Sequence, residues 1–330
     1  MNLKIIHSNS KLYSPAWKKI SRIFGIPLPL DRTEKINFGF DYKILSPIPS
    51  DPYTNKSFAE LCDVRAQELN QKASKPILIM WSGGIDSTVV LCSFLNQNIN
   101  IIVGYTESSI EEYPWLFNFC KEKNIPLRYI TNDSFKQLQM DYCFVTGIIG
   151  DQIVGTLKHF NSDTDLRIRS NQLDDYRKIV NPYLLELFDE SIKSFPIEII
   201  DYADFLWWVN FVFKYQWIQT HLMNITDFDP SLEYHHFFDT VEFQQWAMTN
   251  RDLNKQFILE NKPLHYKLTF KEYIYNILND AEYLQKEKRS SMSMTTFPFK
   301  FNENLFIEID DIQKIISYEE YNEIQTSSKI

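Results

Sequence analysis

The sequence predicts an α/β fold in which a parallel, doubly wound sheet is joined to a mainly helical second half. Between residues 76 and 145, short apolar runs typical of buried strands alternate four times with segments that have helical spacing of apolar residues. The links between them are short, which favours parallel strands with right-handed crossovers and helices on both faces. With 44% apolar residues, a chain of 330 residues can bury a large core.

Residues 1–55 are expected to form an extension that packs on the main domain. Six prolines between residues 15 and 52 break any long helix. Short strands are expected near residues 3–6 and 36–44. The chain is therefore divided into this extension over 1–55, an α/β domain over 56–190, and a helical part over 191–330 that completes the site.

The α/β domain is predicted to begin with a helix and to continue with four strands. Ser57 and Glu60 form a capping-box pattern at the start of that helix. The expected strands are at residues 77–80, 101–105, 127–130 and 142–145. The helices between them are expected to carry Val89 to Leu95, then Trp115 to Cys120 after a second capping box at Ser108 and Glu111, and then Phe135 to Met140.

The second half has helical spacing throughout. Helices are predicted over residues 184–192, 202–222, 238–249 and 270–279. The second of these carries a stripe of aromatic and apolar side chains, which is more typical of a core than of a ligand platform. The stripe consists of Trp207, Trp208, Phe211, Tyr215 and Ile218.

The stretch 82–88 lies between the first strand and its helix and has the composition of an anion-binding turn. Backbone N–H groups at a helix N-terminus are unpaired and carry partial positive charge. Glycines let the backbone approach an anion closely, and hydroxyl groups add donors. A carboxylate suits this place if a divalent cation lies between it and the phosphates. The predicted pyrophosphate-binding residues are Ser82, Gly83, Gly84, Asp86, Ser87 and Thr88.

Two further strand ends are expected to converge on the same crevice, because ligands of open α/β sheets bind beyond the carboxyl ends of the strands. Asp151 lies in the turn after the fourth strand, where it would bring a second carboxylate beside Asp86. The pair is predicted to hold one Mg²⁺ against a pyrophosphate. The other residues predicted to line the crevice are Gly104, Tyr105, Thr146 and Gly147.

The stretch 82–87 resembles the PP-loop of N-type ATP pyrophosphatases, whose pattern is Ser-Gly-Gly-x-Asp-Ser. These enzymes cut ATP between the α and β phosphates and hold the released pyrophosphate in the loop. The stretch 146–155 is similar to the Ser-Gly-Glu-Gly-x-Asp-Glu-x-x-Gly motif of the asparagine synthetase ATP domain. The resemblance covers residues 57–292 and implies a Rossmann-like sheet of the adenine nucleotide α-hydrolase type.

Three weaker segments extend the resemblance in the family's order. Residues 232–243 resemble Leu-Glu-x-Arg-x-Pro-Phe-Leu-Asp followed by Val-Glu-Phe, residues 271–275 resemble Lys-x-x-Leu-Arg, and residues 282–288 resemble Glu-Ile-Leu-x-Arg-x-Lys. By position, the resemblance implies three catalytic residues. These are Lys288 as the active-site lysine, Lys271 as a second lysine near the phosphates, and Glu233 as an acid or base.

The resemblance implies a Mg²⁺-ATP-dependent, AMP-forming ligase. In such an enzyme a substrate carboxylate attacks the α-phosphate, pyrophosphate leaves, and the acyl-adenylate reacts with ammonia or an amine to give an amide. ATP and Mg²⁺ are the implied cofactors. The implied partners are a small-molecule or peptide carboxylate and an amine substrate.

The chain departs from the family pattern in two places. Ile148 stands where the family motif has an acid, so Glu233, or else His235 or His236, is expected to take over proton transfer. Fewer than 80 residues precede the loop, which is too few for the family's glutaminase domain. The nucleophile is therefore expected to be free ammonia, ammonia from a separate subunit, or an amine of a substrate. A homodimer is left open.

Composition narrows the remaining choices. The net charge of −9 argues against broad nucleic-acid binding by the whole surface. The four cysteines have no zinc-site spacing and are expected to be buried and reduced, which fits a cytoplasmic protein. No signal peptide and no membrane-spanning segment are predicted.

Two other functions stay open. The first is a PP-loop enzyme that adenylates a base of tRNA or a deazapurine; its thiolating members often need a cysteine pair and its nitrile-forming members a zinc cysteine cluster, and neither is evident here. The second is a non-catalytic nucleotide-binding protein, in which Ile148 marks lost chemistry.

Overall fold

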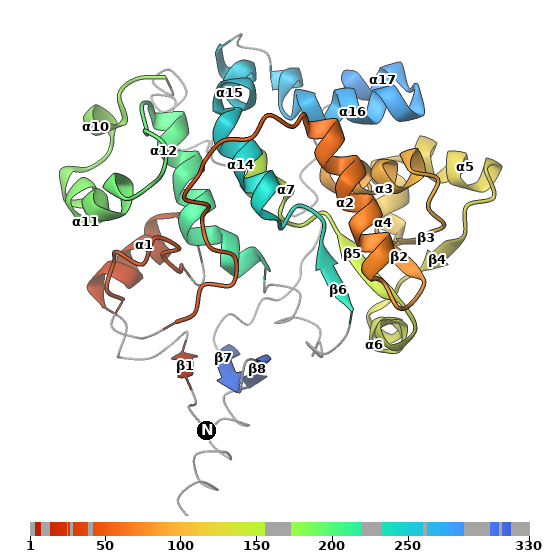
Figure 1. Ribbon diagram of the computed structural model, residues 1–330, viewed down its shortest axis with the longest axis horizontal. Helices are drawn as coiled ribbons and strands as arrows, with labels where there is room; N and C mark the ends of the chain where they lie inside the picture. Colours follow the sequence, from red (N-terminus) through yellow and green to blue (C-terminus); the bar gives the residue numbers. More distant parts are fainter. Residues whose placement is uncertain are drawn as a thin grey trace, which may run out of the picture.

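The structure is built around a five-stranded sheet whose strands all run parallel, as predicted (Figure 1). It is a computed structural model, and it describes residues 4–7, 14–24, 26, 29–38, 42–155, 173–219, 233–259, 263–286, 304–309 and 312–317. The strands are β2 (Ile77–Met80), β3 (Ile102–Tyr105), β4 (Leu127–Tyr129), β5 (Cys143–Thr146) and β6 (Tyr234–His236).

The strand order is β4-β3-β2-β5-β6. From β2 the chain moves outward through β3 to β4, and then returns to the other side of β2 to form β5. The order therefore reverses between β2 and β5, and the carboxyl ends of these two strands flank the place where open α/β sheets bind ligands. Strand β6 adds a fifth parallel strand beside β5, which the sequence analysis did not predict.

Helices cover both faces of the sheet, as the doubly wound arrangement requires. Alternate residues of each strand point to opposite faces. On one face, Ile79 and Val145 belong to the large core that also includes α2, α3 and α5. On the other face, Leu78 and Phe144 form a small second core with Leu138 of α6. These helices are α2 (Phe58–Lys72), α3 (Ile85–Asn96), α5 (Pro114–Glu122) and α6 (Asn132–Asp141).

One of the two predicted capping boxes is confirmed and the other is wrong. Ser57 accepts a hydrogen bond from the Glu60 backbone, and the Glu60 side chain binds back to Ser57, so α2 begins where the sequence predicted. Near the second site the box is formed instead by Thr106 and Ser109. This box begins a separate helix, α4 (Glu107–Glu112). Helix α4 ends before Pro114 because proline has no N–H to continue it, and Pro114 is the first residue of α5.

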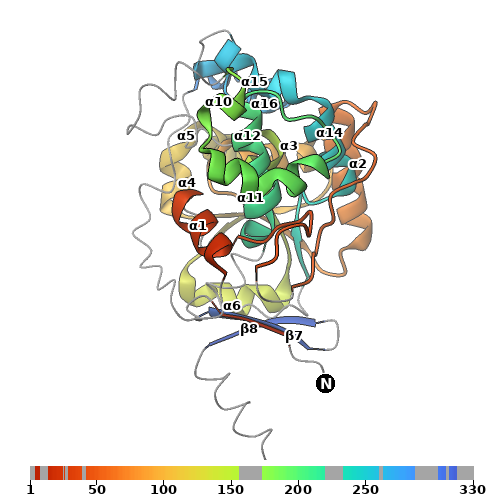
Figure 2. The same cartoon turned by 90° about the vertical axis from the view of Figure 1, so that its left-hand side faces the viewer.

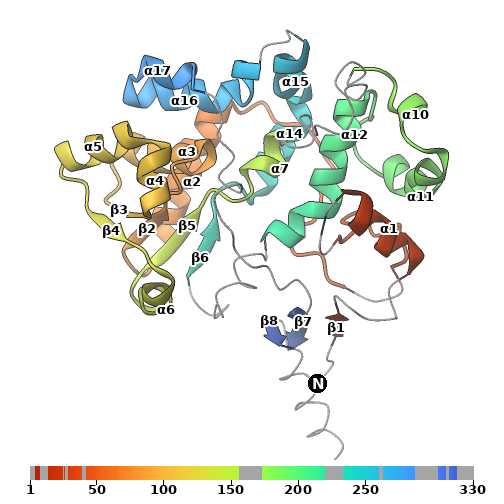
Figure 3. The ribbon, with the colours of Figure 1, turned by 180° about the vertical axis from the view of Figure 1, so that it is seen from behind.

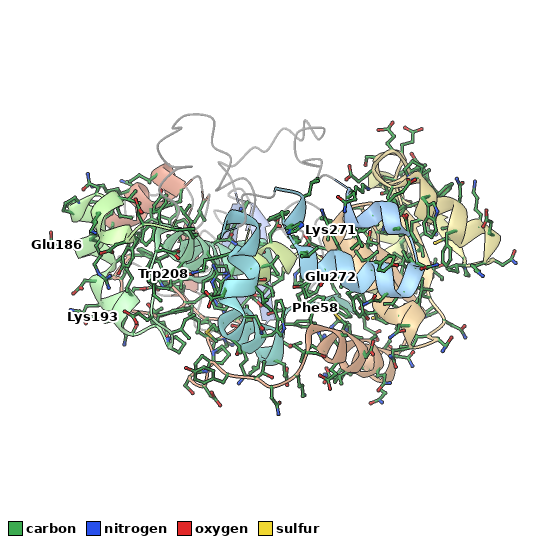
Figure 4. All side chains as sticks on the ribbon, turned by 90° about the horizontal axis from the view of Figure 1, so that it is seen from above. Phe58, Glu186, Lys193, Trp208, Lys271 and Glu272 are labelled. Atoms are coloured by element: carbon green, nitrogen blue, oxygen red, sulfur yellow. The ribbon has the colours of Figure 1, made fainter. Side chains whose placement is uncertain are left out.

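The second half is helical, and Figure 3 shows α12 between the sheet and the outer helices α1, α10 and α11. The predicted aromatic stripe is core: Trp207, Trp208, Phe211 and Tyr215 are all buried. Figure 4 places Trp208 inside this half, whereas Glu186 and Lys193 of α11 lie at its outer edge. The main elements are α7 (Gly150–Val154), α10 (Tyr176–Ile179), α11 (Pro182–Lys193), α12 (Tyr202–Val209), a π-helical turn (Asn210–Lys214), α14 (Val241–Thr249), α15 (Arg251–Leu259), η2 (Pro263–His265), α16 (Leu268–Leu278) and α17 (Ala281–Leu284).

The extension packs chiefly on the helical half. It contains α1 (Pro15–Phe24), which the count of prolines did not predict; Pro15 is its first residue, where a missing N–H costs nothing (Figure 2). The N–H groups of Leu30 and Arg32 donate to the carbonyls of Phe213 and Val212 in the π-helical turn. The large core includes Trp17 together with residues of both other parts of the chain.

A small antiparallel sheet joins segments that are far apart in the sequence. Strand β1 (Lys4–His7) confirms the predicted strand near residues 3–6, and it pairs with β7 (Asn304–Ile309), which pairs with β8 (Ile312–Ser317). The strand expected over 36–44 is absent from the part of that range that the structure describes. None of the described helices combines the length and the apolar character needed to cross a bilayer.

Candidate nucleotide and metal site

The loop after β2 is shaped by one glycine with a left-handed backbone. Gly83 has φ +79°, and a Cβ there would lie 2.6 Å from the Ser109 carbonyl oxygen and from Cβ of Glu112. Ser109 in turn donates its hydroxyl to the Trp81 carbonyl at 2.8 Å. The loop is therefore held tightly against α4, and only glycine fits at this position.

The loop ends at the N-terminus of α3, where Gly84 is the N-cap and no side chain caps the first turn. This leaves the end of a twelve-residue helix with its partial positive charge facing the loop. Ser82 is exposed there, whereas Ser87 and Thr88 are buried and both donate to the Gly84 carbonyl. Of the three predicted hydroxyl donors, only Ser82 is exposed; the other two hold the turn in shape.

The turn after β5 packs directly on the first turn of α3. A Cβ at Gly147 would lie 2.7 Å from the Asp86 carbonyl carbon and 2.8 Å from the Ser87 nitrogen, and one at Gly150 would lie 2.6 Å from the Asp86 carboxylate. These glycines let two loops from neighbouring strands touch. Asp86 and Asp151, predicted to share a cation, are thereby brought to one place.

Lys267 joins the two carboxylates. Its ammonium donates to Asp86 Oδ1 in a very short contact and to Asp151 Oδ1 at 2.6 Å. The Lys267 side chain is fully buried, while 21% of the Asp86 side chain and 33% of the Asp151 side chain stay exposed. A cationic group thus already lies between the two predicted metal ligands, with part of each carboxylate still open to solvent.

Lys267 was not among the predicted site residues, although the sequence carries a signal for it. The Lys-x-x-Leu-Arg pattern was matched to residues 271–275. Shifted four residues earlier, it pairs Lys267 with Phe270 and Lys271, which keeps a lysine first and a cation last. Lys267 also has a left-handed backbone, with φ 55°, which costs a lysine about 1 kcal/mol or more. Such strain often marks functional positions.

Asp151 is held from two further sides. The Tyr266 hydroxyl lies 3.2 Å from its Oδ1 and 2.9 Å from the Gly155 carbonyl. Asn210, at the start of the π-helical turn, donates to the Asp151 carbonyl at 2.8 Å. The helical half therefore helps to position Asp151.

Lys271 lies among main-chain carbonyls of the helical half. Its ammonium donates to the carbonyls of Leu264 and Lys286, both at 2.7 Å, and the residue is 1% exposed. Figure 4 shows it on α16. The contacts bind η2 and the segment after α17 to α16, so this lysine helps to hold the helical half together. Its role near phosphates stays a prediction.

Glu233 lies at the opposite edge of the sheet. It immediately precedes β6, and it accepts hydrogen bonds from the Ser74 backbone and hydroxyl before the start of β2. This is the amino edge of the parallel strands, roughly 10 Å from the carboxyl edge for strands of this length. Its position therefore argues against the predicted role as an acid or base beside the loop.

His236 and Thr146 bind each other. Thr146 Oγ1 lies 2.9 Å from His236 Nδ1, and His236 Nε2 lies 2.6 Å from the Gln219 carbonyl. Because a carbonyl only accepts, Nε2 carries the proton and Nδ1 accepts from the hydroxyl. Burial lowers the pKa of His236 and also that of His235. Both nitrogens of His236 are thus occupied, and the Thr146 hydroxyl donates to one of them.

Three of the remaining residues named in the sequence analysis pack against the cores of the α/β domain, and one lies outside the described part of the chain. Gly104 packs against Ile130 and Leu78, so its lack of a side chain serves the small core. Tyr105 is half-buried at the carboxyl end of β3, and the centroid of its ring lies 4.9 Å from that of Phe117. Ile148 is partly buried against the large core. Lys288 lies outside the described residues.

The donor set at Asp86 and Asp151 fits Mg²⁺. Two carboxylates on adjacent loops already surround a cationic nitrogen, and Mg²⁺ in nucleotide sites takes one or two carboxylates with the phosphates and water. Among the residues that the structure describes, no group of three or more His, Cys, Asp or Glu side chains is placed to hold a metal ion.

A scan against protein-family models and a search of curated proteins both find no match to this chain.

Proposed function

We propose that this chain is a Mg²⁺-ATP-dependent ligase that adenylates a carboxylate with release of pyrophosphate and then forms an amide with ammonia or an amine. The observation that carries the proposal is the convergence of Asp86 and Asp151 at the reversal point of the sheet, beside the uncapped N-terminus of α3. An anion site next to a cation site is what a metal-bound pyrophosphate requires.

Each described group has a task in this proposal. The loop N–H groups and the Ser82 hydroxyl bind phosphate oxygens and keep that charge in place as it grows on the leaving pyrophosphate. The carboxylates of Asp86 and Asp151 hold the metal, which when bound neutralises phosphate charge. Gly83 keeps the loop against α4 so that the backbone can approach the phosphates.

The cysteines favour this proposal over base thiolation. All four thiols are free and buried. Burial raises the pKa of Cys120 and of Cys143 to about 12, and raises that of Cys62 and Cys92 as well. A thiol with a raised pKa is a poor nucleophile at neutral pH. Chemistry that depends on a reactive cysteine is therefore disfavoured.

The test is product analysis with Mg²⁺-ATP labelled at the α-phosphate and pools of candidate carboxylates and amines. We expect AMP and pyrophosphate in equal amounts with the pool that contains the substrates. Asp86→Asn should lower the rate at least about 100-fold, since it removes a metal ligand at the leaving group. Asp252→Asn is the matched control, because that side chain is 94% exposed on α15 and should leave the rate unchanged.

Two outcomes would contradict the proposal. Release of ADP and phosphate would show cleavage between the β and γ phosphates instead of between the α and β phosphates. Binding of ATP without turnover in any pool, with Asp86→Asn abolishing the binding, would favour the non-catalytic nucleotide-binding protein. Thermal unfolding of both variants shows whether a lost rate comes from a lost fold.

A further inference from the structure

The charges at the centre of the site balance only in part. Asp86 and Asp151 carry two negative charges, and the Lys267 ammonium that bridges them carries one positive charge. The ammonium contacts the same oxygen, Oδ1, of each carboxylate. A divalent cation that bound these two oxygens would occupy the same space as the ammonium, so the two cations compete for the pair.

We propose that Lys267 is an internal cation that competes with a divalent metal for Asp86 and Asp151, and that its ammonium must leave their Oδ1 atoms before metal binds there. The inference rests on the proposed function in taking Asp86 and Asp151 as the metal ligands. It concerns metal binding itself, which does not require turnover. An ammonium and a divalent cation at the same oxygens would repel each other strongly, because like charges a few ångströms apart in a partly buried site are poorly screened.

The Lys267 ammonium also has two aromatic neighbours in its bound position, and its place in the chain leaves the side chain able to turn. The rings of Tyr266 and Phe270 each lie 5.6 Å from Nζ, which is within the range of cation–π attraction. The residue is the N-cap of α16 and has a left-handed backbone, so it lies at a join between elements and not inside a helix. A side-chain rotation there breaks no helical hydrogen bond.

The order of binding follows from this competition. Metal alone must displace an ammonium that is fully buried and bound to both carboxylates. Metal that arrives with nucleotide also brings phosphate charge, which compensates the displaced ammonium. The site should therefore bind free metal weakly and metal–nucleotide well, so that an isolated cation does not fill it.

The experiment measures Mn²⁺ binding without nucleotide by electron paramagnetic resonance, with Mn²⁺ as the probe for Mg²⁺. Lys267→Met removes the charge and keeps the length of the side chain, and we expect Mn²⁺ to bind at least about tenfold more tightly than to the unmodified protein. Lys267→Gln is measured in parallel as a second neutral variant. Lys267→Arg keeps the charge and should leave the affinity near that of the unmodified protein.

Adding Asp151→Asn to Lys267→Met should remove the gain, which would assign the Mn²⁺ to this pair. Circular dichroism and thermal unfolding establish that each variant is folded. The inference is overturned if either folded neutral variant binds Mn²⁺ no more tightly than the unmodified protein. That failure is distinct from failure of the proposed function, because AMP and pyrophosphate release is measured separately and can persist. If Mn²⁺ affinity rises tenfold in the neutral variants but the protein never releases pyrophosphate, the inference about Lys267 stands and the proposed ligase function is wrong.

Discussion

His236 shows how a single buried side chain can make the fold sensitive to pH. Its two ring nitrogens face the Thr146 hydroxyl and the Gln219 carbonyl, and the neutral ring satisfies both. Protonation would place a second N–H against the Thr146 oxygen and a charge in a buried site. Burial therefore lowers the pKa of the ring below the usual 6.5 of histidine.

The sign of the effect follows from proton counting. Between the lowered folded pKa and about 6.5, the unfolded chain binds more protons at this residue, so stability is complete above about pH 6.5 and is lost as the pH falls. His236→Gln does not titrate there. We expect the free-energy difference between the two proteins to shrink by up to about 1.4 kcal/mol per pH unit below 6.5. Urea unfolding at pH 7.5, 6.0 and 5.0 measures it, and a constant difference would contradict the assignment.

At the residue scale, the sequence predicted which two carboxylates lie together better than it predicted the catalytic roles of single residues. Asp86 and Asp151 were predicted because each lies in a glycine-containing turn at a strand end, where the topology of the sheet brings the two turns together. Glu233 and Lys271 were chosen by position in a pattern, and position does not tell which edge of a sheet or which carbonyls a side chain will meet. Lys267 was missed because the Lys-x-x-Leu-Arg pattern can be placed on Lys267 or, four residues later, on Lys271, and the sequence does not decide between them.

At the scale of elements, the contact between α3 and the turn after β5 controls the site. Gly147→Ala would place a Cβ 2.7 Å from the backbone of Asp86, and backbone cannot yield as a side chain does. We expect a loss of about 1–3 kcal/mol in the free energy of unfolding and weaker binding of metal–nucleotide, because the two carboxylates would separate.

Gly84→Ala is the contrasting variant. Gly84 has φ −74°, and its nearest neighbour would be the Ser82 hydroxyl at 3.3 Å, so alanine is accommodated. Its unfolding free energy should change by less than about 1 kcal/mol. Guanidinium unfolding compares the two variants directly. A larger loss for Gly84→Ala than for Gly147→Ala would show that the packing of these loops has been misjudged.

The elements of the α/β domain were predicted because their signals are local. Apolar runs, capping residues and short links lie within a few residues of one another, and four strands follow from them. Strand β6 could not be found in this way. Tyr234–His236 is short and polar, and only its pairing with β5, about 90 residues earlier in the chain, makes it a strand.

On the scale of the whole molecule, Arg32 joins the extension to the helical half. Its buried guanidinium donates to the carbonyls of Ser46 and Phe211 and to the Gln244 side chain, and lies 3.9 Å over the Tyr215 ring. Burial lowers its pKa to about 10, which still leaves it charged at neutral pH. A single side chain therefore satisfies acceptors from three segments.

Arg32→Met should lower the free energy of unfolding by about 3 kcal/mol, because it leaves those acceptors buried without a donor. Arg32→Lys should recover only part of the loss, since one ammonium cannot donate to all the acceptors that the planar guanidinium reaches. Lys35→Met is the control, as Lys35 is exposed nearby. Chemical unfolding followed by tryptophan fluorescence and by circular dichroism should give one coincident transition. Separate transitions would show that the extension unfolds on its own.

The place of the extension could not be predicted for the same reason as β6. Nothing near residues 14–50 indicates that their partners are the carbonyls of a π-helical turn, and a π-helical turn has no clear sequence signal. Periodicity predicted the helix that contains it and the burial of its aromatic side chains, but not which of its carbonyls would accept hydrogen bonds from outside.

The contact between Arg32 and Phe211 also has a consequence for how the chain is made. The two residues are 179 positions apart. At the usual 5–20 residues per second of a ribosome, the extension emerges roughly 10–40 s before its acceptor is synthesised. For most of that interval Phe24 of α1 lacks its ring partners Phe188 and Phe205. We therefore expect chaperones that hold nascent polypeptides to bind the growing chain until translation reaches the helical half.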